Sequence, residues 1–259
     1  MDLNVKDYLI LEGYRGSWSH GTYVPSSDPN SIGDIDTMGV FIPPIEYYFG
    51  LHSIQSKQVK EGQYDRIYYE IRKFFHLLLK GNPNVVCMLW LRDSDYLLRS
   101  EWGNMLIANR NLFVSKLAFK SFAGYANAQM RKMEHFSFNG YMGKKRKELV
   151  QRFSFDIKNA SHLIRLLHMC IDFLKTGEYI VYRPEREKLI DIKTGKWTLE
   201  QVKREAEVLF RQAEQEYEKC SLPAKPQFVK AEELLFCMIE DFLRTGSTFL
   251  KRGFPVTYD

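Results

Sequence analysis

Two short motifs near the N-terminus, Gly16-Ser17-Trp18-Ser19-His20-Gly21-Thr22 and Gly33-Asp34-Ile35-Asp36, carry the most information in this sequence. The chain before the first motif is an apolar run that indicates a strand leading into a turn. A glycine in that turn lets the backbone approach a ligand closely, and the serine after it offers a hydroxyl and a backbone N–H at a predicted helix start. Such a turn is suited to holding a triphosphate.

The second motif places two carboxylates close together. Asp34 and Asp36 are two residues apart in an alternating segment, and in a strand such residues point to one face. The two side chains repel each other unless a cation lies between them, and oxygen ligands that share substrate phosphates favour Mg²⁺ or Mn²⁺. Asp65 lies in another alternating run, from which a neighbouring strand would supply a third carboxylate. Three carboxylates suit two metal ions.

The N-terminal part of the chain has the pattern of a small mixed sheet. Up to about residue 100, short apolar runs alternate with Gly, Pro, Asp and Ser, and residues 8–11, 34–41 and 64–69 indicate strands. Residues 71–79 have helical spacing and are followed by Lys80-Gly81-Asn82-Pro83, which ends a helix.

From about residue 111 onward, apolar residues recur at helical spacing. Helices are predicted over residues 112–133, 149–174, 198–220 and 228–250. Segments of this length with short links are typical of an antiparallel bundle. The predicted fold class is therefore α+β, with a small mixed-sheet domain over residues 1–105 followed by an α-helical bundle domain over residues 106–259.

The composition excludes several classes of protein. The 259 residues are 45% apolar and 27% charged, which are globular proportions and exclude a disordered or fibrous chain. The net charge of +5 permits a polyanionic partner without requiring one. The four cysteines form no C-x-x-C pair, so neither a zinc ribbon nor a disulfide framework is expected. With no signal peptide and no apolar run of the roughly 18 residues that span a membrane, we expect a soluble cytoplasmic protein without a membrane partner.

Taken together, the Gly-Ser turn, the Asp-x-Asp strand and the later Asp strand resemble the DNA polymerase β-like nucleotidyltransferase superfamily. Within it the chain is most similar to the YcgL-type group, also called the RNA-repair-pathway polymerase β-like proteins. The likeness to this group rests on Arg72-Lys73-Phe74, Gly81-Asn82-Pro83-Asn84-Val85, Gly124-Tyr125-Ala126 with Gln129, and Lys158-x-Ala160-x-His162-Leu163-x-Arg165-Leu166. It covers most of the chain and implies the same α+β fold, with a polymerase β-like catalytic domain before the helical one.

The resemblance also implies roles for individual residues. Asp34 and Asp36 correspond to the first two metal ligands and Asp65 to the third, while Gly16 and Ser17 correspond to the triphosphate-binding turn. All three carboxylates would then be both catalytic and metal-binding.

Three features depart from the family pattern. Glu70 is an alternative third ligand, although it is better placed as an acidic residue in the first turn of the next helix. The separation between the two motifs is long, so an extra loop over residues 22–30 is expected at the mouth of the site. Cys87 stands where an acidic residue is expected, which weakens any expectation of a further carboxylate there.

Further nucleotide-binding candidates lie in two places. Ser19 and His20 continue the Gly-Ser turn, where His20 either contacts phosphate or ribose or hydrogen-bonds the loop. Lys158, His162 and Arg165 share one helix face that is expected to close over the triphosphate or base, with the two cations countering negative charge. The alternative is a charged face that pairs with acidic residues of the first domain.

A basic run, Lys144-Lys145-Arg146-Lys147, follows the aromatic-bearing loop Gly140-Tyr141-Met142-Gly143. Such a run after a loop can follow a nucleic-acid backbone, and these four residues are the candidate RNA contacts. The alternative is an ordinary solvated loop. If the run lies on the far side of the molecule from the site, an RNA partner becomes less attractive.

The predicted function is a metal-dependent nucleotidyltransferase. It would bind a nucleoside triphosphate (ATP or another NTP) and two Mg²⁺ or Mn²⁺ ions, transfer a nucleoside monophosphate to an acceptor hydroxyl, and release pyrophosphate. By the resemblance, the first expected acceptor is an RNA end, such as that of tRNA. One alternative is nucleotidylylation of a protein side chain, of the AMPylation type, and another is a non-catalytic nucleotide or RNA sensor.

Overall fold

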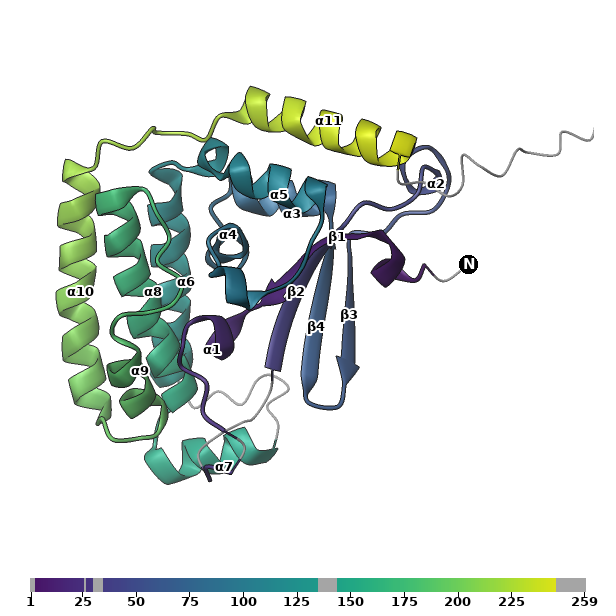
Figure 1. Cartoon of the computed structure of the whole chain (residues 1–259). Coiled ribbons are helices and arrows are strands. Elements are labelled where there is room, and N and C mark those ends of the chain that lie inside the picture. Colours follow the sequence, from purple (N-terminus) through teal and green to yellow (C-terminus); the bar gives the residue numbers. More distant parts are fainter. Residues whose placement is uncertain (1–2, 26, 30–34, 135–143, 246–259) are drawn as a thin grey trace, which may run out of the picture.

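The computed structural model describes residues 3–25, 27–29, 35–134 and 144–245 (Figure 1). The strands in these ranges form one sheet in the order β3-β4-β2-β1-β5. Their bounds are Leu9–Tyr14 for β1, Ile35–Phe41 for β2, Ser56–Glu61 for β3, Tyr64–Glu70 for β4 and Tyr96–Arg99 for β5. Only β2 and β4 pair in parallel, so the sheet is mixed, as predicted.

The parallel pair β2/β4 fixes the position of two predicted metal ligands. In its register Asp36 lies opposite Asp65, and Phe41 lies opposite Glu70. Residues opposite each other on neighbouring strands point to the same face of a sheet. Asp36 and Asp65 are therefore neighbours on one face, as the sequence pattern predicted.

The two faces of the sheet differ in what covers them. Met38 and Val40 belong to the large core shared with the helices, whereas Phe41 and Tyr68 belong to a small cluster on the opposite face. Because Asp36 alternates in step with Met38 and Val40, it lies on the face that the helices cover.

The helices of the N-terminal part are short. Their bounds are Gly16–Ser19 for α1, Glu46–Phe49 for α2, Ile71–Leu79 for α3, Pro83–Val86 for α4 and Glu101–Ala108 for α5, with 3₁₀ turns at Val5–Tyr8, Cys87–Leu89, Asp93–Asp95 and Arg110–Phe113. The predicted helix over residues 71–79 is confirmed as α3.

Longer helices make up the C-terminal part. Their bounds are Leu117–Glu134 for α6, Lys144–Phe153 for α7, Ile157–Thr176 for α8, Arg186–Lys193 for α9, Leu199–Lys219 for α10 and Phe228–Thr245 for α11. Helix α8 is the most buried of them and packs against α6, α9 and α10 (Figure 1). None of the helices in the described ranges is long and apolar enough to span a bilayer.

Two helix predictions are corrected. The helix predicted over residues 149–174 is two helices, because Ser154 takes a left-handed conformation with φ of 63° and Asp156 starts α8 by accepting from the backbone N–H groups of Lys158 and Asn159. Helix α11 does not join the bundle. It returns to lie beside α5 and α3 of the N-terminal part (Figure 1). There Trp102 of α5 donates to Asp241 and packs edge-on against Phe242.

The hydrophobic core is continuous across both parts of the chain. One cluster includes Ile10 and Val40 from the sheet, Leu163 from α8 and Phe242 from α11. Shared burial of this kind fixes the sheet against the helical part. The division into domains at residues 105 and 106 stays a prediction.

Candidate functional site

The turn after β1 requires a glycine for two reasons. Gly16 has φ of +64°, and a Cβ at this position would lie 2.6 Å from Oδ2 of Asp36. A side chain would therefore be strained by the backbone conformation and would also collide with a carboxylate. The missing Cβ lets the turn lie directly against Asp36.

Asp36 is the described carboxylate that borders this turn. Its side chain is 25% exposed and its Oδ1 lies 3.6 Å from Nη2 of Arg15, while its backbone carbonyl accepts from the Arg15 N–H at 2.9 Å. The other acid of the motif, Asp34, lies outside the described residues. The role of Asp36 as a metal ligand stays a prediction.

Asp65 lies beside Asp36 in the β2/β4 register, but its carboxylate is directed to the β3 side. It accepts from Nε2 of Gln58 at 2.6 Å and lies 3.7 Å from Nζ of Lys60. Within the described ranges no three His, Cys, Asp or Glu side chains gather as a metal site would require. The role of Asp65 as a third ligand stays a prediction.

Glu70 lies at the other end of β4 and has a structural role. It is the N-cap of α3, where it accepts from the backbone N–H of Lys73, and it pairs with Arg72 at 2.9 Å. Its interpretation as an acidic residue at a helix start is confirmed. Its carboxylate serves the helix rather than the turn at Gly16.

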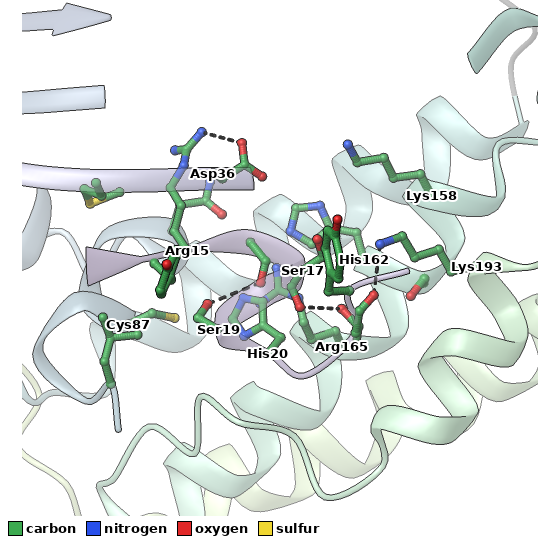
Figure 2. A pocket seen from close by; sticks show the side chains of 18 of the residues that line it. Arg15, Ser17, Ser19, His20, Asp36, Cys87, Lys158, His162, Arg165 and Lys193 are labelled. Atoms are coloured by element: carbon green, nitrogen blue, oxygen red, sulfur yellow. Dashed lines mark hydrogen bonds and ion pairs between the residues drawn. The ribbon is translucent and has the colours of Figure 1, made fainter. Parts of the chain in front are cut away.

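A cavity of about 260 Å³ opens between the α1 turn, β2 and helices α8 and α9 (Figure 2). It brings together all seven nucleotide-binding candidates that the sequence predicted. The cavity is lined by Tyr14, Arg15, Gly16, Ser17, Ser19, His20, Thr22, Tyr23, Val24, Asp36, Met38, Asn84, Cys87, Met88, Leu91, Lys158, Ser161, His162, Arg165 and Lys193. Asp65 is not among these residues.

Arg165 is a buried cation without an anionic partner. It is 6% exposed, and its Nη1 lies 3.0 Å from Sδ of Met169. Among the described residues, no carboxylate lies within ion-pair distance of it. Burial lowers its pKa to about 10, which leaves it charged at neutral pH. An uncompensated buried charge is costly, so the cavity is suited to an anion.

His20 and His162 line the cavity as neutral side chains. Burial, followed by the charge of Arg165, lowers both pKa values well below the usual range. Nδ1 of His20 lies 2.9 Å from the Val181 carbonyl oxygen. Because a carbonyl can only accept, Nδ1 is the donor, and Nε2 of the neutral ring is therefore an acceptor. Nε2 of His162 is buried without a hydrogen-bond partner in the described structure. On this helix face the charge is therefore carried by Lys158 and Arg165.

The segment before α9, residues 179–183, holds the α1 turn in place. Besides the bond to the His20 ring, the Arg183 N–H donates to the His20 carbonyl at 3.2 Å. Arg183 is itself 1% exposed and is fixed by ion pairs to Asp172 and Glu185. Sequence reasoning did not identify this support, because nothing local links His20 to a segment 160 residues later.

Lys193 is the main lining residue that the sequence prediction missed. It is the last residue of α9, and its Nζ donates to the Thr22 carbonyl at 3.0 Å. Burial and the charge of Lys158 lower its pKa to about 8, while Asp36 acts in the opposite direction. In the sequence, Lys193 followed by Thr194-Gly195 indicates the end of a helix. This signal does not predict that the lysine side chain lines the cavity.

Two departures from the family pattern also lie at the cavity. Cys87 donates from its buried Sγ to the Pro83 carbonyl, and burial raises its pKa to about 11, so the position holds a neutral thiol. Thr22, Tyr23 and Val24, at the start of the expected extra loop, contribute to the lining.

The basic run is helical rather than a loop, because it forms the first turn of α7. Arg146 is not a free contact: it donates to Asp156 at 2.7 Å and to Asn159 at 2.9 Å. Lys144, Lys145 and Lys147 are exposed. The bonds from Arg146 attach this turn to the N-terminal end of α8, which is also the end that carries Lys158. The preceding loop, residues 140–143, lies outside the described residues.

Comparisons with known proteins place the chain in a family. The model of the RNA repair pathway DNA polymerase beta family (RlaP) matches residues 8–236. No curated protein is matched significantly. A solved structure, a nucleotidyltransferase-like protein from Exiguobacterium sibiricum, shares 11% sequence identity over 90% of this chain and 74% of its own, with a TM-score of 0.28. That likeness is too weak to bear on fold or site.

Proposed function

Since the chain belongs to the RNA repair pathway DNA polymerase beta family and is thus a nucleotidyltransferase, we propose that it transfers a nucleoside monophosphate from an NTP to the hydroxyl of an RNA end. Pyrophosphate is the leaving group. The observation that carries this proposal is the cavity in which the Gly16–Ser17 turn and Asp36 face the cations of α8 and α9.

The triphosphate is the part of the substrate that the cavity matches best. Four cations line it. Arg15 pairs with Asp36, the one carboxylate among the described lining residues, and Lys158, Arg165 and Lys193 face it from the helices. Charge-assisted hydrogen bonds to phosphate oxygens are about twice as strong as neutral ones, and they strengthen further where water is excluded. His162 adds a neutral polar group between these cations and Ser17 (Figure 2).

The residues present fit a divalent cation at Asp36. The space left by the missing Cβ of Gly16 places Oδ2 of Asp36 directly against the triphosphate turn. In the proposal Asp34, Asp36 and Asp65 hold two Mg²⁺ or Mn²⁺ ions, with Asp65 leaving its bond to Gln58 to do so. When bound, the ions neutralise charge on the triphosphate and make the acceptor hydroxyl a better nucleophile.

The chain itself contributes orientation. Gly16 and Ser17 hold the triphosphate against the sheet, and Lys158 and Arg165 hold it from the helices, so that the α-phosphate is fixed for in-line attack. Asp65 is the carboxylate nearest the acceptor side in this scheme and accepts the proton of the attacking hydroxyl.

The choice of an RNA acceptor is supported by the position of the basic run. The exposed residues Lys144, Lys145 and Lys147 belong to a helix that Arg146 ties to the cavity end of α8. Three exposed lysines on that side would follow a phosphate backbone leading to the cavity. A basic run on the far side would have argued for a protein acceptor.

The proposal is tested by incubating the purified protein with each α-labelled NTP together with total RNA and total protein. Label in the RNA fraction, with release of pyrophosphate, is the expected result. Label in the protein fraction would replace RNA by a protein side chain as acceptor. Nucleotide binding without pyrophosphate release, whatever acceptor is supplied, would contradict transfer and support a sensor.

A further inference from the structure

Lys193 occupies an unusual position for a lysine. Its side chain extends from the C-terminal end of α9 into the cavity, on the same side as Lys158 and across from Asp36 (Figure 2). Its ammonium donates to a neutral acceptor, the Thr22 carbonyl, at 3.0 Å. In the described part of the chain, no carboxylate lies within ion-pair distance of this ammonium. One of its three N–H donors is thus used, and the described carboxylate that acts on its charge, Asp36, does so from beyond ion-pair distance.

The surroundings of Lys193 are positive as well as buried. Lys158 is near enough to lower its pKa, in the same direction as burial, and Arg165 lines the same cavity without a carboxylate partner. Placing like charges together in a partly buried site is unfavourable in the free protein. The arrangement becomes favourable when a multiply charged anion lies between them.

We propose that Lys193 is a phosphate-binding residue of the site, which contacts the triphosphate of the nucleotide together with Lys158. This inference rests on the proposed function and adds to it a ligand from α9. A lysine is suited to the role because its ammonium is a compact charge that contacts phosphate oxygens from any direction. In the free protein the Thr22 carbonyl holds the ammonium at the cavity.

The first experiment compares Lys193→Met with Lys196→Met. Lys196 lies three residues further along, is exposed, and pairs with Asp191 outside the cavity, so it controls for the loss of one positive charge. Equilibrium binding is measured for inorganic tripolyphosphate, an NTP and the matching nucleoside monophosphate. For Lys193→Met we expect binding of tripolyphosphate and NTP to weaken about 10- to 100-fold, with a much smaller change for the monophosphate. Lys196→Met should bind all three like the wild type.

A second pair of variants separates phosphate binding from support of the Thr22 carbonyl. Lys193→Gln keeps an N–H donor for that carbonyl without the charge, and Lys193→Arg keeps the charge. Phosphate binding predicts that Arg restores most of the triphosphate affinity and Gln does not. If Gln restores it, or if affinity for all three ligands falls equally, Lys193 has only a structural role and the inference is wrong. This pair also decides the question if Lys193→Met does not fold.

The inference and the proposed function fail in different ways. If the wild type binds NTP and transfers nucleotide while Lys193→Met binds tripolyphosphate equally well, the inference is overturned and the function stands. If the wild type binds neither tripolyphosphate nor any NTP, both are overturned.

Discussion

The two walls of the cavity are built in different ways. On the sheet wall, Asp36 has a nearby cation in Arg15 and its position follows from the β2/β4 register. On the helical wall, the buried Arg165 and the half-buried Lys193 are cations with no carboxylate at ion-pair distance among the described residues. Among the described residues, the acid of one wall thus has a cation at ion-pair distance in the free protein, whereas two cations of the other wall have no carboxylate at that distance.

In the proposed function this difference assigns the chemical step to the sheet wall and phosphate binding to the helical wall. In the proposed function the sheet wall holds the triphosphate at the Gly16–Ser17 turn, and its carboxylates position the reacting groups through cations. In the proposed function the helical wall supplies the cations that bind phosphate, and its histidine, His162, stays neutral because burial and the charge of Arg165 hold its pKa well below the usual range. Substitutions on the sheet wall should therefore abolish turnover, and substitutions on the helical wall should weaken affinity.

The largest effect is expected on the sheet wall. Asp34→Ala combined with Asp36→Ala should lower nucleotide incorporation by at least about 10³-fold, because it removes the charges that position the reacting groups. Incorporation of α-labelled nucleotide is the measurement, with Asp93→Ala, an exposed acid outside the cavity, as the control. Full activity of the double variant would contradict the proposed division of roles, because the sheet wall would then have no part in chemistry.

On the helical wall, Arg165→Met should affect binding and stability in opposite directions. Removal of a phosphate ligand should weaken NTP affinity by about 10- to 100-fold. Removal of an unpaired buried charge, with a side chain of similar length in its place, should leave the free energy of unfolding unchanged or raise it. Affinity is measured by equilibrium titration and stability by urea denaturation. A marked loss of stability would show that Arg165 supports the core rather than a ligand.

Gly16→Ala tests the contact between the α1 turn and the sheet wall. The left-handed backbone costs an L-residue about 1–2 kcal/mol, and the new Cβ would also meet Oδ2 of Asp36. We expect a loss of stability of at least this size in urea denaturation. Gly124→Ala is the matched control, since Gly124 lies in α6 with no atom near its Cβ position, and alanine there should stabilise the helix by about 0.5–1 kcal/mol. Equal effects at the two positions would contradict the close approach at Gly16.

The smallest expected effect is the pH dependence of stability that the buried histidines produce. His20 and His162 have folded-state pKa values well below 6.5, so below about pH 6.5 the unfolded chain binds protons that the folded chain does not. The contribution of these histidines to the free energy of unfolding should therefore be fully present above about pH 6.5. It should fall as the pH drops, by at most about 1.4 kcal/mol per pH unit for each histidine. Urea denaturation between pH 7.5 and 5.5 measures this slope.

The control for this effect is an exposed histidine. His162→Gln should flatten the slope, whereas His76→Gln, at an exposed position, should leave it unchanged. The same slope in all three proteins would mean that His162 is charged in the folded state. The helical wall would then carry a further cation, and the difference in charge between the two walls would be larger.

The sheet wall could be predicted from the sequence because its parts are local. The Gly16–Ser17 turn and Asp36 belong to two short motifs, and the alternation in β2 and β4 fixes which face each carboxylate takes. The strands that escaped prediction are the edge strands β3 and β5. Ser56–Glu61 has no apolar face to bury, and Leu97 and Leu98 in β5 are both exposed, so neither segment shows the alternation of a half-buried strand.

The helical wall could be predicted only in part, because its residues meet through tertiary packing. Lys158, His162 and Arg165 share one face of α8 and were found by helical spacing. Lys193 comes from a separate helix that is joined to α8 by contacts such as the bond from Ser161 Oγ to the Leu189 carbonyl. The break between α7 and α8 depends on a single left-handed residue, Ser154, which no periodic pattern reveals.

The two bonds between His20 and residues 179–183 have a consequence for the synthesis of the protein. They join positions about 160 residues apart, so the α1 turn gains its support only after most of the chain has left the ribosome. A nascent chain that ends before Tyr179 can pair its strands but lacks the segment that holds this turn. Activity in the proposed function would therefore require translation past residue 183, because a shorter product lacks the support for the α1 turn even with every sheet residue present.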